Sequence, residues 1–309
     1  EEQAKLAEQV PRLVSLLLSG GDVDPDAVGT FPAIESLHVG IITPDLGHST
    51  EPPHNYTAGS GPDVDFNPTG QCMTNNGNGK AGFMQVEGLL GVTRDPCVAI
   101  TPPEGTLYMN YFPDSGFTPQ DLINDVECVT GQDNGCGFEQ QLESILASDR
   151  NTANGGFNRD GALLAVILIT DEDDCSTTDP RVFDVEQHNS NPYQGPWVDP
   201  MTKAEVQFNL RCSAHSEALE QIQRYVDGIA GLKDDPSQVV FAAITGIPED
   251  TPEDRAKFNS DEERYAELLD ETLTPSMKEV PNPAAAGTQG QQLTPACTAT
   301  DGSGDAFPA

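Results

Sequence analysis

Basic residues are scarce in this chain. Of its 309 residues, 15 are Lys or Arg and 50 are Asp or Glu, which gives a formal net charge of −35. Nucleic-acid binding needs a positively charged footprint, so the composition argues against that function. The net negative charge also disfavours docking on an anionic membrane. The charge favours a cation-rich setting, either calcium-loaded or saline, although solubility alone would also explain it.

Several sequence signatures are absent as well. The chain has no apolar run long enough to span a bilayer and no signal peptide. It begins with Glu rather than Met, so we expect it to be a piece of a longer protein, to which a lipid anchor could be attached upstream. No P-loop, GxSxG or HExxH motif is present, and no GxGxxG motif follows a predicted strand, so nucleotide-binding, dinucleotide-binding and hydrolase functions lack their signatures.

The seven cysteines contain no CxxC pair, which argues against a zinc ribbon or a thioredoxin-type motif. Cysteines spread through loop segments predict disulfides and an extracytoplasmic location, whether secreted, periplasmic or on an outer-membrane lipoprotein. Their odd number leaves at least one thiol unpaired within this chain. Cys72 and Cys97 are candidates to staple the long segment between them.

Amphipathic and aliphatic segments alternate along the chain. The aliphatic run at 162–170 has no polar alternation, so we predict a central strand covered on both faces. The order of segments indicates an α/β fold, a Rossmann-like and mostly parallel sheet with helices on both faces and long disulfide-stapled loop insertions. The predicted helices are 1–20, 118–129, 138–147 and 213–232, and the predicted strands are 36–43, 107–112, 162–170 and 238–245.

The same pattern sets the domain boundaries. Residues 1–275 are predicted to form one domain, with an insertion at about 48–105 that is rich in Gly, Pro, Asn and Thr. A structureless loop of this length is improbable in a compact domain unless it is functional or stapled. Residues 276–309 are rich in Pro, Ala, Gly, Gln and Thr and are predicted to be a tail or loop, which could lead to a final helix beyond the chain.

Four acidic residues, Asp171 to Asp174, directly follow the predicted strand at 162–170. They lie at its carboxyl end, the edge at which open α/β sheets bind their ligands. Carboxylates there suit a hard divalent cation such as Mg²⁺ or Ca²⁺. We take Asp171 and Asp173 as candidate metal ligands, with Asp45 after an earlier strand as their companion. A solvated acidic turn is the alternative.

A second acidic pattern lies near the amino end. Asp22, Asp24 and Asp26 alternate on a predicted turn, as at the opening of a calcium loop. An EF-hand loop requires Gly at its sixth position and Glu at its twelfth, where this chain has Ala27 and Ala33. These residues form a secondary calcium candidate, and a polar connector is the alternative.

Four sequence blocks resemble the von Willebrand factor A-type domain, and more narrowly a secreted or lipid-anchored bacterial group of such domains. They occur in the order and with the spacing of that family, and they cover most of the predicted helices and strands but not the loops. The blocks are E-Q-A-K-L-A-E-Q-V-P-R-L at Glu2–Leu13, L-H-V-G-I-I-T-P-D-L-G at Leu37–Gly47, G-C-G-F-E-Q-Q-L-E-S at Gly135–Ser144, and G-F-N-R-D-G-A-L-L-A-V-I-L-I-T-D-E-D-D-C-S at Gly156–Ser176.

The resemblance implies a metal-ion-dependent adhesion site with three parts. An Asp-x-Ser-x-Ser motif follows the first strand, a Thr comes from a second loop, and an Asp, matched here by Asp171, ends a later strand. The first motif and the central strand before it would lie upstream of Glu1, so the resemblance predicts a chain truncated at that point.

The second part of that site departs from the family pattern. The loop Gly135–Glu139 takes its place and carries no Thr. Either Glu139 supplies an oxygen to the metal instead, or the loop contributes nothing. In the same resemblance, Cys136 of this loop would bridge to Cys175 and tie the loop to the metal side of the sheet.

These observations favour a non-enzymatic extracytoplasmic binding domain that holds an acidic group of a protein partner through a divalent cation. The alternative is a structural or surface-display module, in which the metal site is vestigial and the stapled loops make the contacts. A metal-dependent hydrolase is a third reading. It would need further carboxylates at other strand ends, where Asp45 is the obvious companion.

Overall fold

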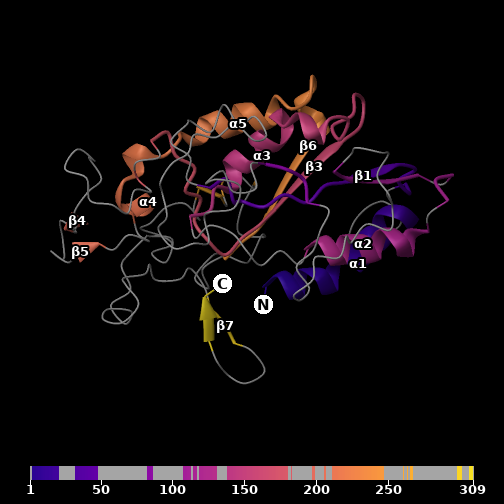
Figure 1. Ribbon diagram of the computed structural model, residues 1–309, viewed down its shortest axis with the longest axis horizontal. Coiled ribbons are helices and arrows are strands. Elements are labelled where there is room, and N and C mark those ends of the chain that lie inside the picture. Colours follow the sequence, from indigo (N-terminus) through magenta and orange to yellow (C-terminus); the bar gives the residue numbers. More distant parts are fainter. Residues whose placement is uncertain are drawn as a thin grey trace. The chain divides into compact units, whose positions relative to one another are not determined.

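The chain combines helices with short strands in the computed structural model (Figure 1). Its helices are α1 (Glu2–Ser19), α2 (Pro119–Thr130), α3 (Gln141–Arg150), α4 (Arg211–Ala214) and α5 (Ile222–Ala230). Its strands are β1 (Leu37–Val39), β2 (Met109–Tyr111), β3 (Leu164–Ile169), β4 (Trp197–Val198), β5 (Glu205–Val206), β6 (Val239–Ile244), β7 (Thr298–Thr300) and β8 (Ala306–Pro308). The structure describes residues 2–20, 32–47, 82–85, 107–112, 114–116, 118–130, 138–179, 182, 197–198, 205–206, 211–246, 260, 263, 265–266, 298–300 and 306–308.

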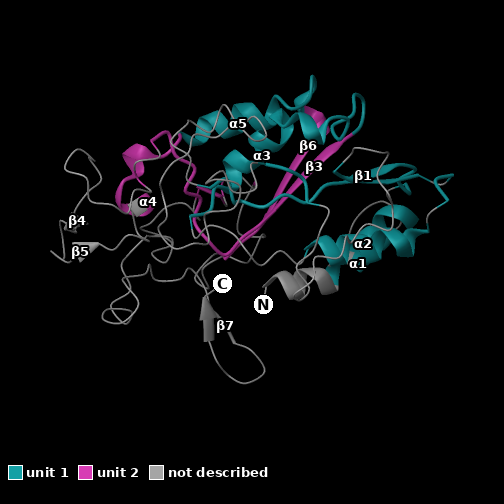
Figure 2. Cartoon of the chain, in the orientation of Figure 1, with its two compact units in different colours: residues 1–162, 221–236 teal, residues 163–220, 237–309 magenta. Residues whose placement is uncertain are grey.

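Two compact units divide the chain (Figure 2). The first unit comprises residues 1–162 and 221–236, and the second comprises residues 163–220 and 237–309. The chain therefore crosses between the units more than once, and each unit is built from segments that are distant in the sequence.

The core of the first unit lies between α1, α2 and the β1–β2 pair. Its buried residues include Val14 of α1, Met109 of β2 and Leu122 of α2. The predicted first helix is confirmed. It ends at Ser19, before Gly20, whose positive φ of 67° suits glycine. Pro11 lies inside α1, and the helix continues past it.

Helix α2 begins with reciprocal hydrogen bonds at its amino end. The Thr118 hydroxyl accepts from the Asp121 backbone N–H at 3.2 Å, and the Asp121 carboxylate accepts from the Thr118 N–H at 2.8 Å. These bonds satisfy backbone donors that the helix cannot satisfy itself. The helix predicted at 118–129 is therefore confirmed, with its first helical residue at Pro119.

Strand β1 pairs with β2 in antiparallel register, from Leu37 opposite Tyr111 to Val39 opposite Met109. The predicted strand at 36–43 was too long, because its second half leaves this ladder. There the Ile41 carbonyl accepts from the Gln85 backbone N–H at 2.7 Å.

Helices α3 and α5 pack together in the first unit around a buried carboxylate. The Glu143 side chain on α3 is completely buried and lies 2.5 Å from the Arg150 guanidinium on the same helix. It also forms an ion pair with Arg224 on α5. The two helices pack closely at Gly228 of α5. A Cβ added there would lie 3.0 Å from the Leu146 side chain on α3, which is a tight contact.

The second unit contains a parallel sheet of β3 and β6. Six pairs join them in register, from Leu164 opposite Val239 to Ile169 opposite Ile244. Both strands are confirmed where the aliphatic runs predicted them. Parallel strands require a crossover connection, and α5 lies in the segment that connects these two.

The predicted burial of this sheet is wrong. Ile167 of β3 is 47% exposed and Ile244 of β6 is 59% exposed, so one face of the sheet is open. An aliphatic run establishes that a strand is apolar, but it does not establish that other elements cover it. In the part of the chain that the structure describes, β3 and β6 form a sheet of two strands only.

The predicted helix at 213–232 is wrong in its first half. After α4 comes a 3₁₀ turn at Ser216–Ala218, and then Leu219 forms a β-bridge with Thr177. The Ala218 carbonyl and the Glu220 N–H are bonded to that neighbouring segment, so they are unavailable for a continuous helical ladder. Helix α5 therefore begins only at Ile222.

Two further antiparallel pairs, β4 with β5 and β7 with β8, complete the strands. The second pair lies in the 276–309 tail that was predicted as loop. The predicted insertion at 48–105 is described only at residues 82–85, and the predicted boundary at 275 lies outside the described residues.

The buried carboxylate gives a stability prediction. Glu143→Gln keeps the side-chain size but removes the charge shared by two guanidinium groups, so the free energy of unfolding should fall by about 3 kcal/mol. Urea unfolding would measure the change. Asp149→Asn, at an exposed position on the same helix, should change it by less than about 0.5 kcal/mol. Equal effects of the two substitutions would contradict this account of the α3–α5 contact.

Candidate acidic site after strand β3

An acidic segment begins where β3 ends. The Thr170 backbone N–H donates to the Ile244 carbonyl at 3.2 Å, which extends the β3–β6 ladder by one hydrogen bond. The Thr170 hydroxyl then accepts from the Glu172 N–H at 3.1 Å. Asp171, Glu172 and Asp173 are exposed. The predicted position of Asp171, at the carboxyl end of a parallel strand, is therefore confirmed.

The carboxylates of this segment are crowded. Burial by neighbouring protein atoms raises the pKa of Glu172, and the charges of Asp171 and Asp173 raise it further. Burial likewise raises the pKa of Asp173. Because both side chains keep substantial exposure to water, solvent screens part of this effect. The segment nevertheless holds its negative charges at an electrostatic cost.

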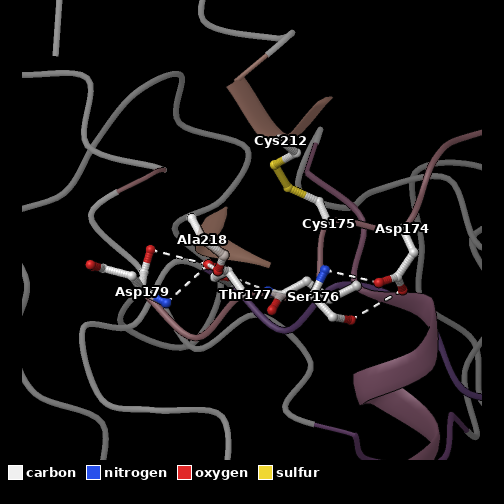
Figure 3. Close-up of a disulfide and its surroundings, with 9 residues drawn as sticks. Asp174, Cys175, Ser176, Thr177, Asp179, Cys212 and Ala218 are labelled. Carbon is white, nitrogen blue, oxygen red and sulfur yellow. Dashed lines mark hydrogen bonds between the residues drawn. A yellow bond between two sulfur atoms is a disulfide. The ribbon is translucent and has the colours of Figure 1, made fainter. Parts of the chain in front are cut away.

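The residues after the acidic segment form a tightly bonded loop (Figure 3). The Asp174 carboxylate accepts from the Ser176 backbone N–H at 3.0 Å and from its hydroxyl at 3.1 Å. The Thr177 hydroxyl donates to the Ala218 carbonyl at 2.5 Å. The Ser176 carbonyl accepts from the Glu220 N–H at 2.9 Å. This loop is thus fixed against residues 216–220.

A disulfide between Cys175 and Cys212 anchors the same loop to α4 (Figure 3). The expected bridge from Cys136 to Cys175 is therefore wrong, because Cys212 in the second unit is the partner. The two residues are 37 positions apart with a Cα–Cα distance of 5.6 Å, which suits a disulfide. Closing a loop of this length stabilises a fold by roughly 4 kcal/mol in the chain-entropy description.

The other cysteines are less informative. Cys128 is also disulfide-bonded. Cys72, Cys97 and Cys136 lie outside the described residues, so the predicted staple of the long insertion stays a prediction.

Asp45 and Glu139 lie in the first unit, in two segments that contact each other. Gln140 joins them, because its backbone N–H donates to the Pro44 carbonyl at 3.0 Å and its side-chain amide donates to the Gly47 carbonyl at 3.2 Å. The Asp45 carboxylate is buried and accepts from the Gly47 N–H at 3.1 Å. The structure thus brings Asp45 near the Glu139 segment, and Asp45 stabilises its own turn.

The candidate ligands do not form a complete metal site by themselves. Within the ranges that the structure describes, no three or more His, Cys, Asp or Glu side chains are grouped so that they could hold a metal ion. Asp171 and Asp173 belong to the second unit, whereas Asp45 and Glu139 belong to the first. Asp22, Asp24 and Asp26 lie outside the described residues.

Sequence reasoning missed the residues that hold the acidic segment in place. Ser176, Thr177 and Cys212 were not singled out, although the run D-C-S-T-T is of the kind that forms local side-chain turns. That composition could have indicated a fixed loop. The choice of Cys212 as partner depends on tertiary structure and has no local signal.

Comparison of the chain with protein-family models, with curated proteins and with solved structures finds no significant match in any of the three. The class that the structure itself defines is a mixed helix and strand protein with a small parallel sheet and an acidic segment at one end of it.

In the described residues, no helix is both long enough and apolar enough to cross a membrane.

The raised pKa of Asp173 gives a pH-dependent prediction. The folded state favours the protonated form of the Asp173 carboxyl. The stability that this preference contributes is present below the ordinary pKa of about 4, and it is lost as the pH rises through the raised pKa of the folded protein. Asp173→Asn should therefore raise the urea midpoint at pH 7 and leave it nearly unchanged at pH 3.

A residue with the opposite shift provides the control. Hydrogen bonds from Thr118 lower the pKa of Asp121, so Asp121→Asn should lower the urea midpoint at pH 7. If Asp173→Asn also lowered it there, the crowding inferred for the acidic segment would be refuted.

Proposed function

We propose that this chain is a non-enzymatic extracytoplasmic binding domain that engages a protein partner at the acidic end of β3. The observation that carries the proposal is the exposed segment Asp171–Asp173, which is fixed between a parallel sheet and a disulfide-anchored loop. Groups held on rigid elements bind with less ordering cost than groups on free loops. The structural arrangement therefore suits recognition.

The finer fold in this proposal is a von Willebrand factor A-type domain with a Rossmann-like sheet. Its support is the parallel β3–β6 pair with a helix-bearing crossover, together with Asp171 directly after β3. In that family position, Asp171 would be a ligand of Mg²⁺ or Ca²⁺. A hard cation prefers six or more oxygens, so an acidic group of the partner and water would supply positions that the described residues do not fill.

The extracytoplasmic location rests on the disulfide. Cys175 and Cys212 are both buried, with exposures of 3% and 7%, so their bond is part of the folded structure. Disulfides of this kind persist in oxidising compartments. A lipid anchor upstream stays a prediction.

A surface-display module with a vestigial metal site is the second candidate. It is favoured because the Asp45 carboxylate is engaged in its own turn and the described carboxylates do not group around one ion. In this alternative, partners contact the loops directly and no cation is needed.

A cation titration separates the two candidates. If the adhesion form is correct, Ca²⁺ or Mg²⁺ should bind the full chain, and Asp171→Asn should weaken binding at least about ten-fold, because it removes a charged oxygen ligand. Isothermal titration calorimetry would measure both ions. Asp160→Asn, which alters an exposed acid before β3, should leave the affinity unchanged. Equal binding by the parent chain and Asp171→Asn would refute the adhesion form and favour display.

A further inference from the structure

One face of the β3–β6 sheet is apolar and open. Side chains alternate between the two faces of a strand, and residues paired in a parallel ladder share a face. The register of β3 and β6 therefore assigns six residues to this surface, which we call the open face. Its residues are Ala165, Ile167, Ile169, Val240, Ala242 and Ile244.

Every residue of the open face is apolar, and most are exposed. Ile167 is 47% exposed, Val240 is 45% exposed and Ile244 is 59% exposed. Leu163, which precedes β3 and continues the same alternation, is 64% exposed. A contiguous apolar surface of this kind is unusual on a soluble protein and marks a site of interaction.

The opposite face is better covered. Leu164, Val166 and Leu168 of β3 are only partly exposed, as is Val239 of β6. Phe241, at 45%, and Ala243 are the residues of that face that stay exposed. Exposure is therefore concentrated on the open face, while Phe241 offers an equally exposed position on the other side of the same strand.

Charge selects among the occupants that could cover this face. A second copy of the chain would bring two net charges of −35 together, and an anionic lipid surface would be repelled in the same way. At one end, the open face adjoins the acidic segment Asp171–Asp173. A segment with apolar residues flanked by Lys or Arg would bury the aliphatic surface and neutralise nearby charge.

We propose that the open face binds a cationic amphipathic segment of a partner protein, with aliphatic contacts to Ile167, Val240 and Ile244 and with Lys or Arg beside the acidic segment. This inference goes beyond the proposed cation site, because it adds the apolar open face as the main contact and needs no bound metal. The two proposals can therefore fail independently.

The test uses the full chain and a fluorescent synthetic amphipathic helix made of Leu and Lys. Fluorescence anisotropy should show saturable binding at micromolar chain concentration, weakened by salt and unchanged by EDTA. Ile167→Ser should weaken binding about ten-fold, since it removes an aliphatic contact. Phe241→Ser is the matched control, because it removes a side chain of similar exposure from the opposite face and should change affinity less than two-fold.

Three outcomes would overturn the proposal. One is the absence of binding at chain concentrations up to about a hundred times above the micromolar range expected for such a segment. Another is equal binding of a peptide in which every Lys is replaced by Glu, which would remove the role of charge. The third is a concentration-dependent dimer in sedimentation that Ile167→Ser abolishes, which would identify a second copy as the occupant. Loss of Ca²⁺ binding in Asp171→Asn with peptide binding intact would leave this inference standing.

Discussion

The parallel pairing of β3 with β6 is the interaction on which the candidate site and the open face both depend. Their six-residue register sets Ile169 beside Ile244, and the hydrogen bond from Thr170 extends the ladder to the start of the acidic segment. The same register decides which aliphatic side chains share a face. A slip of one residue would exchange the two faces and move the carboxylates relative to the sheet edge.

The acidic segment is held from both sides. The sheet fixes its amino end, and the Cys175–Cys212 disulfide with the hydrogen bonds of Ser176 and Thr177 fixes the loop that follows. This double attachment keeps neighbouring carboxylates close although their charges repel, and that repulsion adds to the effect of burial in raising the pKa of Glu172. A cation or a basic group at this position would reduce that repulsion. The arrangement thus gives the segment a physical reason to bind positive charge.

Sequence reasoning located the main elements because their signals are local. The aliphatic run at 162–170 and the run at 238–245 became β3 and β6 with small differences at their ends, and Asp171 followed from the end of the first run. The prediction of a helix at 213–232 was wrong in its first half. Leu219 fits an amphipathic pattern, but the residues on either side of it form backbone hydrogen bonds with the Ser176–Thr178 segment.

What the sequence could not supply depends on contacts between distant residues. The choice of Cys212 over Cys136 is a tertiary property, since cysteine connectivity cannot be deduced from spacing. Glu143 gave no sign of burial, because one of its partners, Arg224, lies 81 residues away and comes from another helix. The open face was predicted as covered, because composition reports that Ile167 is apolar without reporting what lies against it.

Hydrogen exchange on the intact chain tests the central claim most directly. If β3 and β6 pair as described, the backbone amides that bond across the strands should exchange at least about a hundred-fold more slowly than those of unstructured peptides, because exchange requires the pair to open. Protection should appear together in both strands and extend to the Thr170 amide. Exchange of the Val166 and Ala242 amides at the rate of an unfolded chain would contradict the account.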